Sequence, residues 1–187
     1  VKENFRQLSM VRIGTSGALQ PELIVGTPVV AEKAIGFDGV LNYYAGRNEI
    51  ADLEFEKAFT EHTGWNPLWA KPYVVDAHSE LVDQIAKDDM VRGNTISAVG
   101  FYGPQGRELR LPLANPDLNS RIESFRFGDR KVTNYEMESA PLQGLSRLMG
   151  HRAMTVCSII ANRMRHDATP NYKTAIRDLI ATVLERI

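Results

Sequence analysis

Residues 153–161, with the sequence AMTVCSIIA, contain no charged side chain and are rich in β-branched residues. A short run of this kind is typical of a strand that is buried on both faces of a sheet. Residues 140–149 come before it with a helical pattern, and Gly150 follows them, where glycine commonly ends a helix. The same alternation of helix and strand recurs along the chain. It predicts the α/β class, with a mixed central sheet covered by helices.

Glycine and proline divide the remaining sequence into short apolar segments. Strands are predicted over residues 9–13, 25–35 and 95–101. Helices are predicted over residues 49–62, from the capping residue Asp76 to Ala86, and from Thr169-Pro170 to Leu184. Small residues at 15–18 predict a turn, and the weak patterning of residues 112–130 predicts a loop. No repeat or linker interrupts the pattern, so we expect residues 1–187 to form a single domain.

The composition excludes several classes of function. The net charge of the 187 residues is −1 and the basic residues are scattered, which argues against nucleic acid and anionic membranes as partners. The apolar runs are shorter than the ~20 residues of a membrane-spanning helix. The single cysteine, Cys157, excludes an internal disulfide and fits a cytoplasmic protein. The four histidines lack the spacing of metal ligands, so we expect no metal site.

Polar residues gather where the predicted strands end, which is the edge at which ligands bind in open α/β sheets. The first group is RIGTSG at residues 12–17. A guanidinium grips phosphate with two donors and glycine lets backbone N–H groups approach, so Arg12 and Thr15 could bind an oxyanion. A tight turn with a surface arginine is the alternative explanation.

The second group is FYGPQGR at residues 101–107. Gln105 offers both donor and acceptor atoms, whereas Arg107 offers donors only. On an extended loop both side chains can point into one pocket and read the edge of a planar ring that carries carbonyl groups. Phe101 could supply a stacking face. A Gly-Pro turn with exposed polar side chains is the alternative.

The third group is NYEMES, which ends at Ser139 and is followed by Pro141. Deep inside a helix the proline ring would clash with the carbonyl of Met137, so a helix is predicted to begin near Glu138 or Ser139. Glu136 and Glu138 then lie at its N-terminus, where the helix dipole favours anions. Ionised carboxylates accept hydrogen bonds from sugar hydroxyls, and methionine suits a sugar ring. An acidic helix start with a core methionine is the alternative.

The last group is IIANR at residues 159–163, where the buried strand ends. Ile159 and Ile160 could line a pocket, and Arg163 could support the loop that reads the ring. A structural role for Arg163 is equally compatible with the sequence.

Taken in order, these four groups resemble the nucleoside phosphorylase superfamily and, within it, the uridine phosphorylases. The Glu-Met-Glu element marks the superfamily, whereas Gln-x-Arg after Phe-Tyr is typical of its pyrimidine members. The resemblance runs from about Met10 to the C-terminus. It implies phosphorolysis of uridine to uracil and ribose 1-phosphate, with inorganic phosphate as co-substrate and no cofactor. It also implies a homo-oligomer, a hexamer built from dimers.

The resemblance assigns roles to individual residues. Arg12 and Thr15 would bind phosphate, and Glu136, Met137 and Glu138 would hold the ribose, with Glu138 on its 2′-hydroxyl. The base would be bound by Gln105, Arg107, Phe101, Gly17, Ile159, Ile160 and Arg163. The catalytic residues would be Arg107, Glu138 and Arg12.

The chain departs from the family pattern in two ways. It has Gly-Pro-Gln at residues 103–105, where many relatives have Pro-Gly-Gln or Glu-Gly-Gln, so the loop is expected to approach the base differently. The family also has a further N-terminal part, with a Gly-Asp-Pro-type phosphate loop and with an arginine and a histidine that reach the neighbouring subunit's site. Residues 1–187 do not include it and are expected to be the C-terminal portion of a nucleoside phosphorylase fold.

Two alternative functions are compatible with the sequence. One is a purine nucleoside phosphorylase, or a nucleosidase that uses water, from the same superfamily. The resemblance disfavours purines, because purine enzymes usually have an aspartate after the last core strand. Here that stretch reads Ala161-Asn162-Arg163, and the nearest aspartate is Asp167. The other alternative is an inactive fragment or a nucleoside-binding module.

Overall fold

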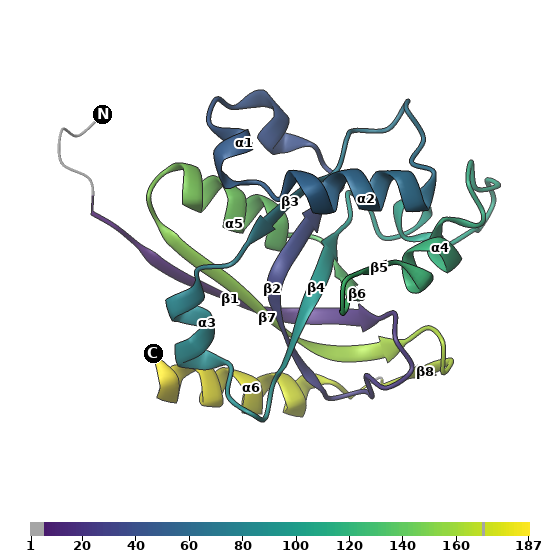
Figure 1. Ribbon diagram of the computed structural model, residues 1–187. Coiled ribbons are helices and arrows are strands. Elements are labelled where there is room, and N and C mark those ends of the chain that lie inside the picture. Colours follow the sequence, from purple (N-terminus) through teal and green to yellow (C-terminus); the bar gives the residue numbers. More distant parts are fainter. Residues whose placement is uncertain (1–5, 170) are drawn as a thin grey trace.

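The computed structural model describes residues 6–169 and 171–187, and Figure 1 shows their arrangement. The strands are β1 (Ser9–Ala18), β2 (Pro28–Gly36), β3 (Tyr73–Asp76), β4 (Val91–Ser97), β5 (Arg126–Phe127), β6 (Arg130–Glu136), β7 (Arg152–Asn162) and β8 (Asp167–Ala168). The α-helices are α1 (Arg47–Ile50), α2 (Leu53–Thr63), α3 (Ser79–Ile85), α4 (Leu118–Ser124), α5 (Ser139–Leu148) and α6 (Lys173–Arg186). Two 3-10 helices are η1 (Val40–Tyr43) and η2 (Gly103–Gln105).

The strands form one mixed sheet with the order β3-β2-β4-β6-β1-β7-β8, and β5 pairs with β6. β4 runs parallel to both β2 and β6, and β1 runs parallel to β7. β2 also pairs with β7 in antiparallel orientation, so the path from β2 through β4, β6, β1 and β7 closes into a barrel. Helices α1, α2 and α5 lie on one side of it and α3 and α6 on the other (Figure 1). The prediction of an α/β fold with a mixed, helix-covered sheet is confirmed.

The core has separate parts under the two layers of helices. Under α2 and α4 it is aromatic: the ring centroids of Phe55 and Phe59 lie 5.2 and 5.3 Å from that of Phe125. Under α3 and α6 it is aliphatic, and there Leu179 packs with Met154 of β7. The buried strand predicted at residues 153–161 lies within β7 and is confirmed.

β1 is longer than the sequence predicts. Residues 15–18, predicted as a turn, continue β1 and pair with β7, with one register shift after Ser16. The guanidinium of Arg12 lies over Gly14, so a side chain at this position would displace it. A Cβ atom at Gly14 would lie 2.9 Å from Nη1 of Arg12. The prediction of a turn over residues 15–18 is wrong, because these residues pair with β7.

The prediction of a loop over residues 112–130 is also wrong. This segment contains α4 and β5 and leads into β6, a strand that the sequence pattern did not reveal. Leu118, Ile122 and Phe125 are buried in the aromatic part of the core. Their spacing is helical, but α4 is short and polar residues fill the positions between them, so the periodic signal is weak.

The helix predicted over residues 49–62 consists of two helices. Asp52 begins the second one, because its side chain accepts a hydrogen bond from the N–H of Phe55 at 3.0 Å. This helix, α2, ends at Gly64 as predicted, with a left-handed φ of 58°. The strand predicted over residues 95–101 is confirmed in part, since β4 begins at Val91 and ends at Ser97.

The predicted starts of the other helices have different outcomes. α5 begins at Ser139, as predicted from Pro141, and is followed by Gly150 with a φ of 71°. Asp76 does not cap α3, because it ends β3, and α3 begins after His78. The last helix is confirmed as α6. Its predicted start at Thr169-Pro170 falls partly on residue 170, which lies outside the described residues.

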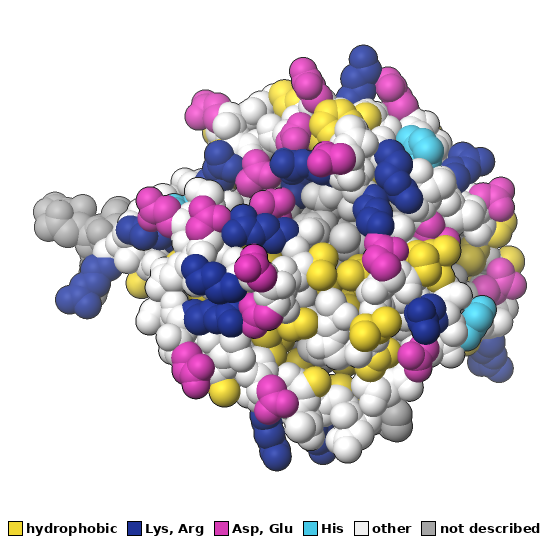
Figure 2. All heavy atoms as spheres, turned by 60° about the horizontal axis from the view of Figure 1, so that its bottom comes forward, with side chains coloured by type: hydrophobic (Ala, Val, Ile, Leu, Met, Phe, Trp, Pro, Cys, Tyr) yellow, Lys and Arg dark blue, Asp and Glu magenta, His cyan; other side chains and the backbone are white. Residues whose placement is uncertain are grey.

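The surface carries charges of both signs. On the face shown in Figure 2, Lys and Arg side chains are interspersed with Asp and Glu, and apolar side chains gather between them. Charges mixed in this way largely offset one another at a distance. Among the described helices, none has the length and apolar character to cross a membrane.

Candidate active site

Arg12 lies between the carboxylates of Glu136 and Glu138. Its Nη1 is 3.0 Å from Oε2 of Glu136, and its Nη2 forms an ion pair with Oε2 of Glu138. The three side chains meet because β1 runs antiparallel to the end of β6 and α5 begins directly after β6. The side chain of Glu136 is 1% exposed, whereas that of Glu138 is 56% exposed. Glu138 is therefore the carboxylate that a ligand can reach.

Glu136 is tied to the N-terminus of α5. Its carboxylate accepts hydrogen bonds from the N–H groups of Glu138 at 2.8 Å and of Ser139 at 3.0 Å. The hydroxyl of Ser97 donates to it at 2.5 Å and accepts from the N–H of Ala140 at 2.8 Å. These bonds satisfy N–H groups that have no partner inside the helix. The acceptor atoms of Glu136 are thus already engaged in holding the site together.

Burial and neighbouring charges both act on the pKa of Arg12 and of Cys157. Burial alone would lower the pKa of Arg12, but Cys157, Glu136 and Glu138 raise it on balance, so the guanidinium stays protonated. Burial and then the charge of Glu136 raise the pKa of Cys157 to about 12, although Arg12 lies 3.4 Å from its Sγ. A neutral thiol is a poor nucleophile. With two carboxylates around one guanidinium, the cluster carries net negative charge.

Gln105 is the centre of a second cluster and is buried at the end of η2. Its side-chain oxygen accepts hydrogen bonds from Nη1 of Arg107 at 2.6 Å and from Nη2 of Arg163 at 3.3 Å. Its main-chain carbonyl accepts from Nη1 of Arg163 and from Nδ2 of Asn119 at 3.1 Å. Guanidiniums only donate, so this cluster favours a ligand edge that offers acceptors.

Arg107 folds back over its own loop. Its guanidinium carbon lies 3.7 Å from the ring centroid of Phe101, and its Nη1 donates to the Phe101 carbonyl. Burial and then the positive charge of Arg163 lower the pKa of Arg107. A ligand with negative charge along one edge would relieve this repulsion between the two guanidiniums. The guanidinium covers one face of Phe101, the ring that was predicted to stack on a base.

The two clusters meet at the end of β6. The guanidinium carbon of Arg163 lies 5.2 Å from the ring centroid of Tyr135, and the next residue, Glu136, binds Arg12. Because side chains alternate along a strand, Tyr135 and Glu136 point to opposite faces of β6. A ligand that touches both clusters must therefore cross the end of the strand, beside Met137, which is 38% exposed.

The side chains of Thr15 and Arg12 point to opposite faces of β1. Val11 and Ile13 of the same strand pack on the aliphatic core under α6. By the alternation of the strand, Thr15 shares their face, whereas Arg12 points the other way, to the two glutamates. A phosphate-binding role for Thr15 stays a prediction.

The remaining predicted base-site residues lie along β1 and β7. Gly17 pairs with Ala161, next to the end of β7. Ile160 is half-buried, and Ile159 is completely buried in a small cluster with Ala18, Leu23 and Val29. The roles of Gly17, Ile159 and Ile160 in binding a base stay predictions.

Ser97, Asn119 and Tyr135 belong to these clusters but were missed in the sequence. Ser97 ends β4, but the strand was predicted to continue to residue 101, so the sequence did not place Ser97 at a strand end. Asn119 lies in α4, a helix that was predicted as loop. Tyr135 stands inside the NYEMES motif, yet β6 was not recognised, and without the strand its direction could not be inferred.

A cavity of about 390 Å³ adjoins the second cluster. It is lined by Arg107 and Arg163 together with Asn119, Glu123 and Asp167. Burial raises the pKa of Glu123, although the charge of Arg163 acts in the opposite direction. The cavity thus combines two guanidiniums with two carboxyl groups.

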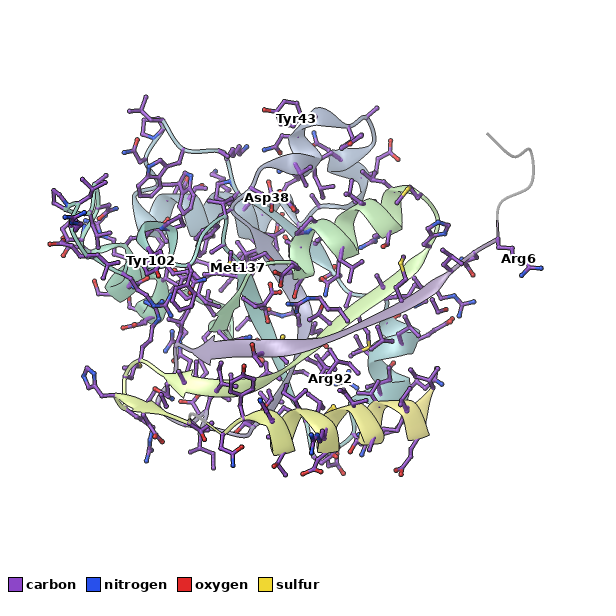
Figure 3. The ribbon with its side chains drawn as sticks, turned by 180° about the vertical axis from the view of Figure 1, so that it is seen from behind. Arg6, Asp38, Tyr43, Arg92, Tyr102 and Met137 are labelled. Carbon is purple, nitrogen blue, oxygen red and sulfur yellow. The ribbon has the colours of Figure 1, made fainter. Side chains whose placement is uncertain are left out.

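A larger cavity, of about 710 Å³, lies on another side of Arg107 and is mostly apolar. It is lined by Asp38, Trp69 and Tyr102, among others. Figure 3 shows Asp38, Tyr102 and Met137 in the same part of the molecule, where β2, β4 and β6 end. Within residues 6–169 and 171–187, no three His, Cys, Asp or Glu side chains are grouped as metal ligands.

The chain is similar to known proteins over almost its entire length. The sequence profile of the phosphorylase superfamily matches residues 3–186. The uridine phosphorylase of Thermococcus kodakarensis is 31% identical, over 85% of this chain and 50% of that protein. The uridine phosphorylase of Escherichia coli is 29% identical, over 89% of this chain and 58% of that protein. The DeoD-type purine nucleoside phosphorylase of Listeria welshimeri is 24% identical, over 95% of this chain and 63% of that protein.

Solved structures have the same fold. A nucleoside phosphorylase of Trypanosoma brucei, described as having uridine phosphorylase activity, superposes with a TM-score of 0.83 at 25% identity. That match covers 95% of this chain and 62% of the other. Isoform 2 of the uridine phosphorylase of Schistosoma mansoni superposes with a TM-score of 0.65 at 22% identity, over 96% and 59%. The chain spans 50 to 63% of the length of the relatives named here. Because the family profile covers residues 3–186, the chain belongs to the phosphorylase superfamily.

Proposed function

We propose that this protein catalyses the phosphorolysis of uridine. A phosphate oxygen forms a bond to C1′ of the ribose, and the bond from C1′ to the base nitrogen breaks. The electron pair of that bond leaves with the base, which takes up a proton. The products are ribose 1-phosphate and uracil, and the reaction uses no metal or organic cofactor.

The donor cluster of Gln105, Arg107 and Arg163 is the observation that carries this proposal. Uracil has two carbonyl oxygens on its polar edge, and negative charge grows on them as the bond to the sugar breaks. Preorganised donors at that edge stabilise the transition state more than the ground state. The names of the matched uridine phosphorylases support the same substrate.

Arg12 and Glu138 would exchange partners when the substrates bind. The net negative charge of their cluster would repel phosphate, so binding requires that a carboxylate leave Arg12. Glu138 is the exposed one, and the 2′-hydroxyl of ribose offers it a hydrogen-bond donor. Once Glu138 turns to the ribose, Nη2 of Arg12 is free for phosphate.

The sugar would then cross the end of β6. Met137 packs against the ribose ring. Glu136 holds the start of α5 in place and, through it, the residues that bind the ribose. Phosphate on Arg12 lies next to C1′ and stabilises the positive charge that develops on the sugar. Phe101, Gly17, Ile159 and Ile160 are proposed to surround the base.

A purine nucleoside is the second candidate substrate, and one observation favours it. Asp167 and Glu123 line the same cavity as Arg107 and Arg163. A carboxyl group in this cavity could donate a proton to a ring nitrogen of a purine as the bond to the sugar breaks. The matched DeoD-type enzyme is a purine nucleoside phosphorylase.

The whole enzyme is proposed to be a cytoplasmic homo-oligomer, a hexamer built from dimers, in which residues 1–187 form one domain, the C-terminal portion of the fold. Exposed apolar side chains beside the 710 Å³ cavity support a contact surface there. Leu109 and Leu111 are 71% and 81% exposed. Apolar surface of this kind is commonly covered by another chain.

The test is product analysis with uridine or inosine, each with and without phosphate. The proposal predicts uracil and ribose 1-phosphate from uridine, and only when phosphate is present. Hypoxanthine from inosine would indicate the purine enzyme, and free ribose without phosphate would indicate a nucleosidase. Uridine that binds in a calorimetric titration but is not converted would indicate a binding module.

Arg107→Ala tests the role assigned to the donor cluster. Loss of a donor to the leaving base is expected to lower kcat/KM for uridine on the order of 100-fold. Arg110→Ala is a matched control, because Arg110 is exposed and lies in the next part of the same loop. A similar loss in both variants, or a mild loss in Arg107→Ala, would contradict the role of Arg107.

A further inference from the structure

We propose that Asn119 is a positioning residue for the loop that reads the base. The inference rests on the proposed function, because the loop is the one that carries Gln105 and Arg107. Asn119 lies in the first turn of α4 and joins three parts of the protein through one side chain. Its Nδ2 donates to the main-chain carbonyl of Gln105 at 3.1 Å, and its Oδ1 accepts from the hydroxyl of Tyr135 at 3.1 Å.

The helix that carries Asn119 is firmly anchored. Leu118 and Ile122 are buried in the aromatic part of the core, on either side of Asn119 in the sequence. Nη1 of Arg121 donates to the carbonyl of Thr63 at the end of α2, at 3.2 Å. Packing and hydrogen bonds of this kind fix the position of the helix, so it is a rigid support for the amide of Asn119.

The other end of the link is also fixed. Tyr135 is buried in the core, and its ring lies beside the guanidinium of Arg163. Its hydroxyl donates to Asn119, which orients the amide so that Nδ2, and not Oδ1, faces the carbonyl of Gln105. The pKa of Tyr135 is raised by burial, so the hydroxyl keeps its proton and remains a donor.

The loop itself is shaped around Asn119. Gly106 has a left-handed φ of 68°, and a Cβ atom there would lie 2.2 Å from Nδ2 of Asn119. The loop turns at Gly106, and the amide of Asn119 lies against this turn. The carbonyl of Gln105 comes just before this turn and the guanidinium of Arg107 just after it. Asn119 therefore fixes the backbone between the two side chains that are proposed to read the base.

Removing the amide should weaken base binding more than phosphate binding. Asn119→Ala leaves the carbonyl of Gln105 with Arg163 as its donor and leaves the hydroxyl of Tyr135 without its acceptor. One such hydrogen bond contributes about 1.4 kcal/mol at the upper end of the usual range, a factor of about 10. We expect the KM for uridine and the Kd for uracil to rise about tenfold, while the KM for phosphate is unchanged.

Tyr135→Phe tests the far end of the link and keeps the ring beside Arg163. It is expected to raise the KM for uridine about threefold, because Asn119 keeps its bond to Gln105 but loses its orientation. The double variant should resemble Asn119→Ala alone, since both changes remove the same link. Ser120→Ala is the control on the same helix, as its hydroxyl bonds only locally, to the carbonyl of Asp117.

The experiment has a second measurement that needs no substrate. The N–H of Arg107 donates to the carbonyl of Tyr102 at 2.9 Å, so it reports the order of the loop through amide hydrogen exchange. Asn119→Ala should speed exchange at Arg107 and leave exchange at Val132 of β6 unchanged. Equal acceleration at both positions would show general loss of stability and would overturn the positioning role.

The two levels of the proposal can fail separately. If the unaltered protein binds neither uridine nor uracil, the proposed function is wrong, and the exchange measurement still decides whether Asn119 orders the loop. If uridine binds and Asn119→Ala changes neither its KM nor the exchange at Arg107, the positioning role is wrong and the proposed function stands. An equal rise in the KM for uridine and for phosphate would also contradict the role.

Discussion

Arg12 and Lys33 are each held between two carboxylates, but the two clusters differ in what their carboxylates do. The ammonium of Lys33 lies 2.9 Å from Oδ2 of Asp52 and 2.6 Å from Oδ1 of Asp76. Its side chain is 5% exposed and lines a charged cavity of about 780 Å³. Both partners also belong to the scaffold, because Asp52 caps α2 and Asp76 ends β3. The Lys33 cluster thus ties the two carboxylates of the scaffold together, although they are 27% and 48% exposed.

In the Arg12 cluster the two carboxylates differ in how far they are exposed to solvent. Glu136 is buried and accepts hydrogen bonds from the start of α5, whereas Glu138 projects into solvent. An ion pair with an exposed carboxylate contributes little to stability, so Glu138 can be released at small cost. Separating a buried pair leaves an uncompensated charge and costs far more.

The difference between the two clusters indicates when a cation held by two carboxylates can bind a ligand. A cluster whose carboxylates both belong to the scaffold stabilises the fold, and neither carboxylate can leave the cation without a cost to the fold. A cluster with one fixed and one exposed partner can exchange the exposed one for a substrate. Four variants test this distinction, beginning with the largest expected effect.

Glu136→Ala should reduce the free energy of unfolding by about 3 to 5 kcal/mol, because it leaves the partly buried Arg12 and the N–H groups at the start of α5 without a partner. The change in the free energy of unfolding is measured by urea titration with circular dichroism as the signal. A change below about 1 kcal/mol would mean that Glu136 does not hold the site together.

Lys33→Ala should reduce the free energy of unfolding by about 2 kcal/mol, less than Glu136→Ala, since water can solvate the partly exposed Asp52 and Asp76. The kcat/KM for uridine, per folded molecule, should stay the same. Lys33→Met is the matched control for the apolar part of the side chain. Loss of turnover with an unchanged free energy of unfolding would show that Lys33 acts in the active site, which would contradict its assignment as a structural residue.

Glu138→Gln should change the free energy of unfolding by less than about 1 kcal/mol, because its ion pair is exposed. It should lower kcat/KM for uridine about tenfold, the effect of one lost charge-assisted hydrogen bond. Deoxyuridine lacks the 2′-hydroxyl, so its turnover should fall less. An equal loss with both substrates would argue against a contact between Glu138 and that hydroxyl.

Asp52→Asn should have the smallest effect and should appear in the pH dependence of stability. Burial alone would raise the pKa of Asp52, but the N–H of Phe55 and the ammonium of Lys33 lower it on balance. A carboxyl with a lowered pKa stabilises the fold above its unfolded pKa, and this stabilisation is lost as the pH falls.

The measurement for Asp52→Asn is urea unfolding between about pH 5 and about pH 2, a range that spans the ordinary pKa of Asp, about 3.9, and extends below it. The unaltered protein should lose more stability over this range than the variant. Glu61→Gln is a control, because its contact with Lys57 is long, at 4.0 Å, and exposed. Identical pH profiles for the protein and Asp52→Asn would show that the Lys33 cluster does not hold Asp52 ionised.

The sequence was informative wherever one residue imposes a strong local constraint. Pro141 determined where α5 begins, and Gly64 and Gly150 marked the ends of two helices. The order of the polar groups placed Gln105 next to Arg107 and Glu136 next to Glu138. These features depend on neighbours in the chain, so they can be read without the fold.

Contacts between distant segments could not be read in this way. Residues 15–18 resembled a turn because they are small, and only their pairing with β7 shows that they continue the strand. β6 was missed because it is flanked by polar residues, and with it the opposite directions of Tyr135 and Glu136. Asn119 had no local signal, since its partners are 14 and 16 residues away along the chain.

The central claim is that one nucleoside touches both clusters across the end of β6. A crystal structure of the protein soaked with uridine and phosphate tests it most directly. The account predicts the uracil edge on Gln105 and Arg107, and the 2′-hydroxyl within hydrogen-bond distance of Glu138, whose carboxylate has left Arg12. Uridine bound to one cluster only, with Glu138 still paired to Arg12, would contradict it.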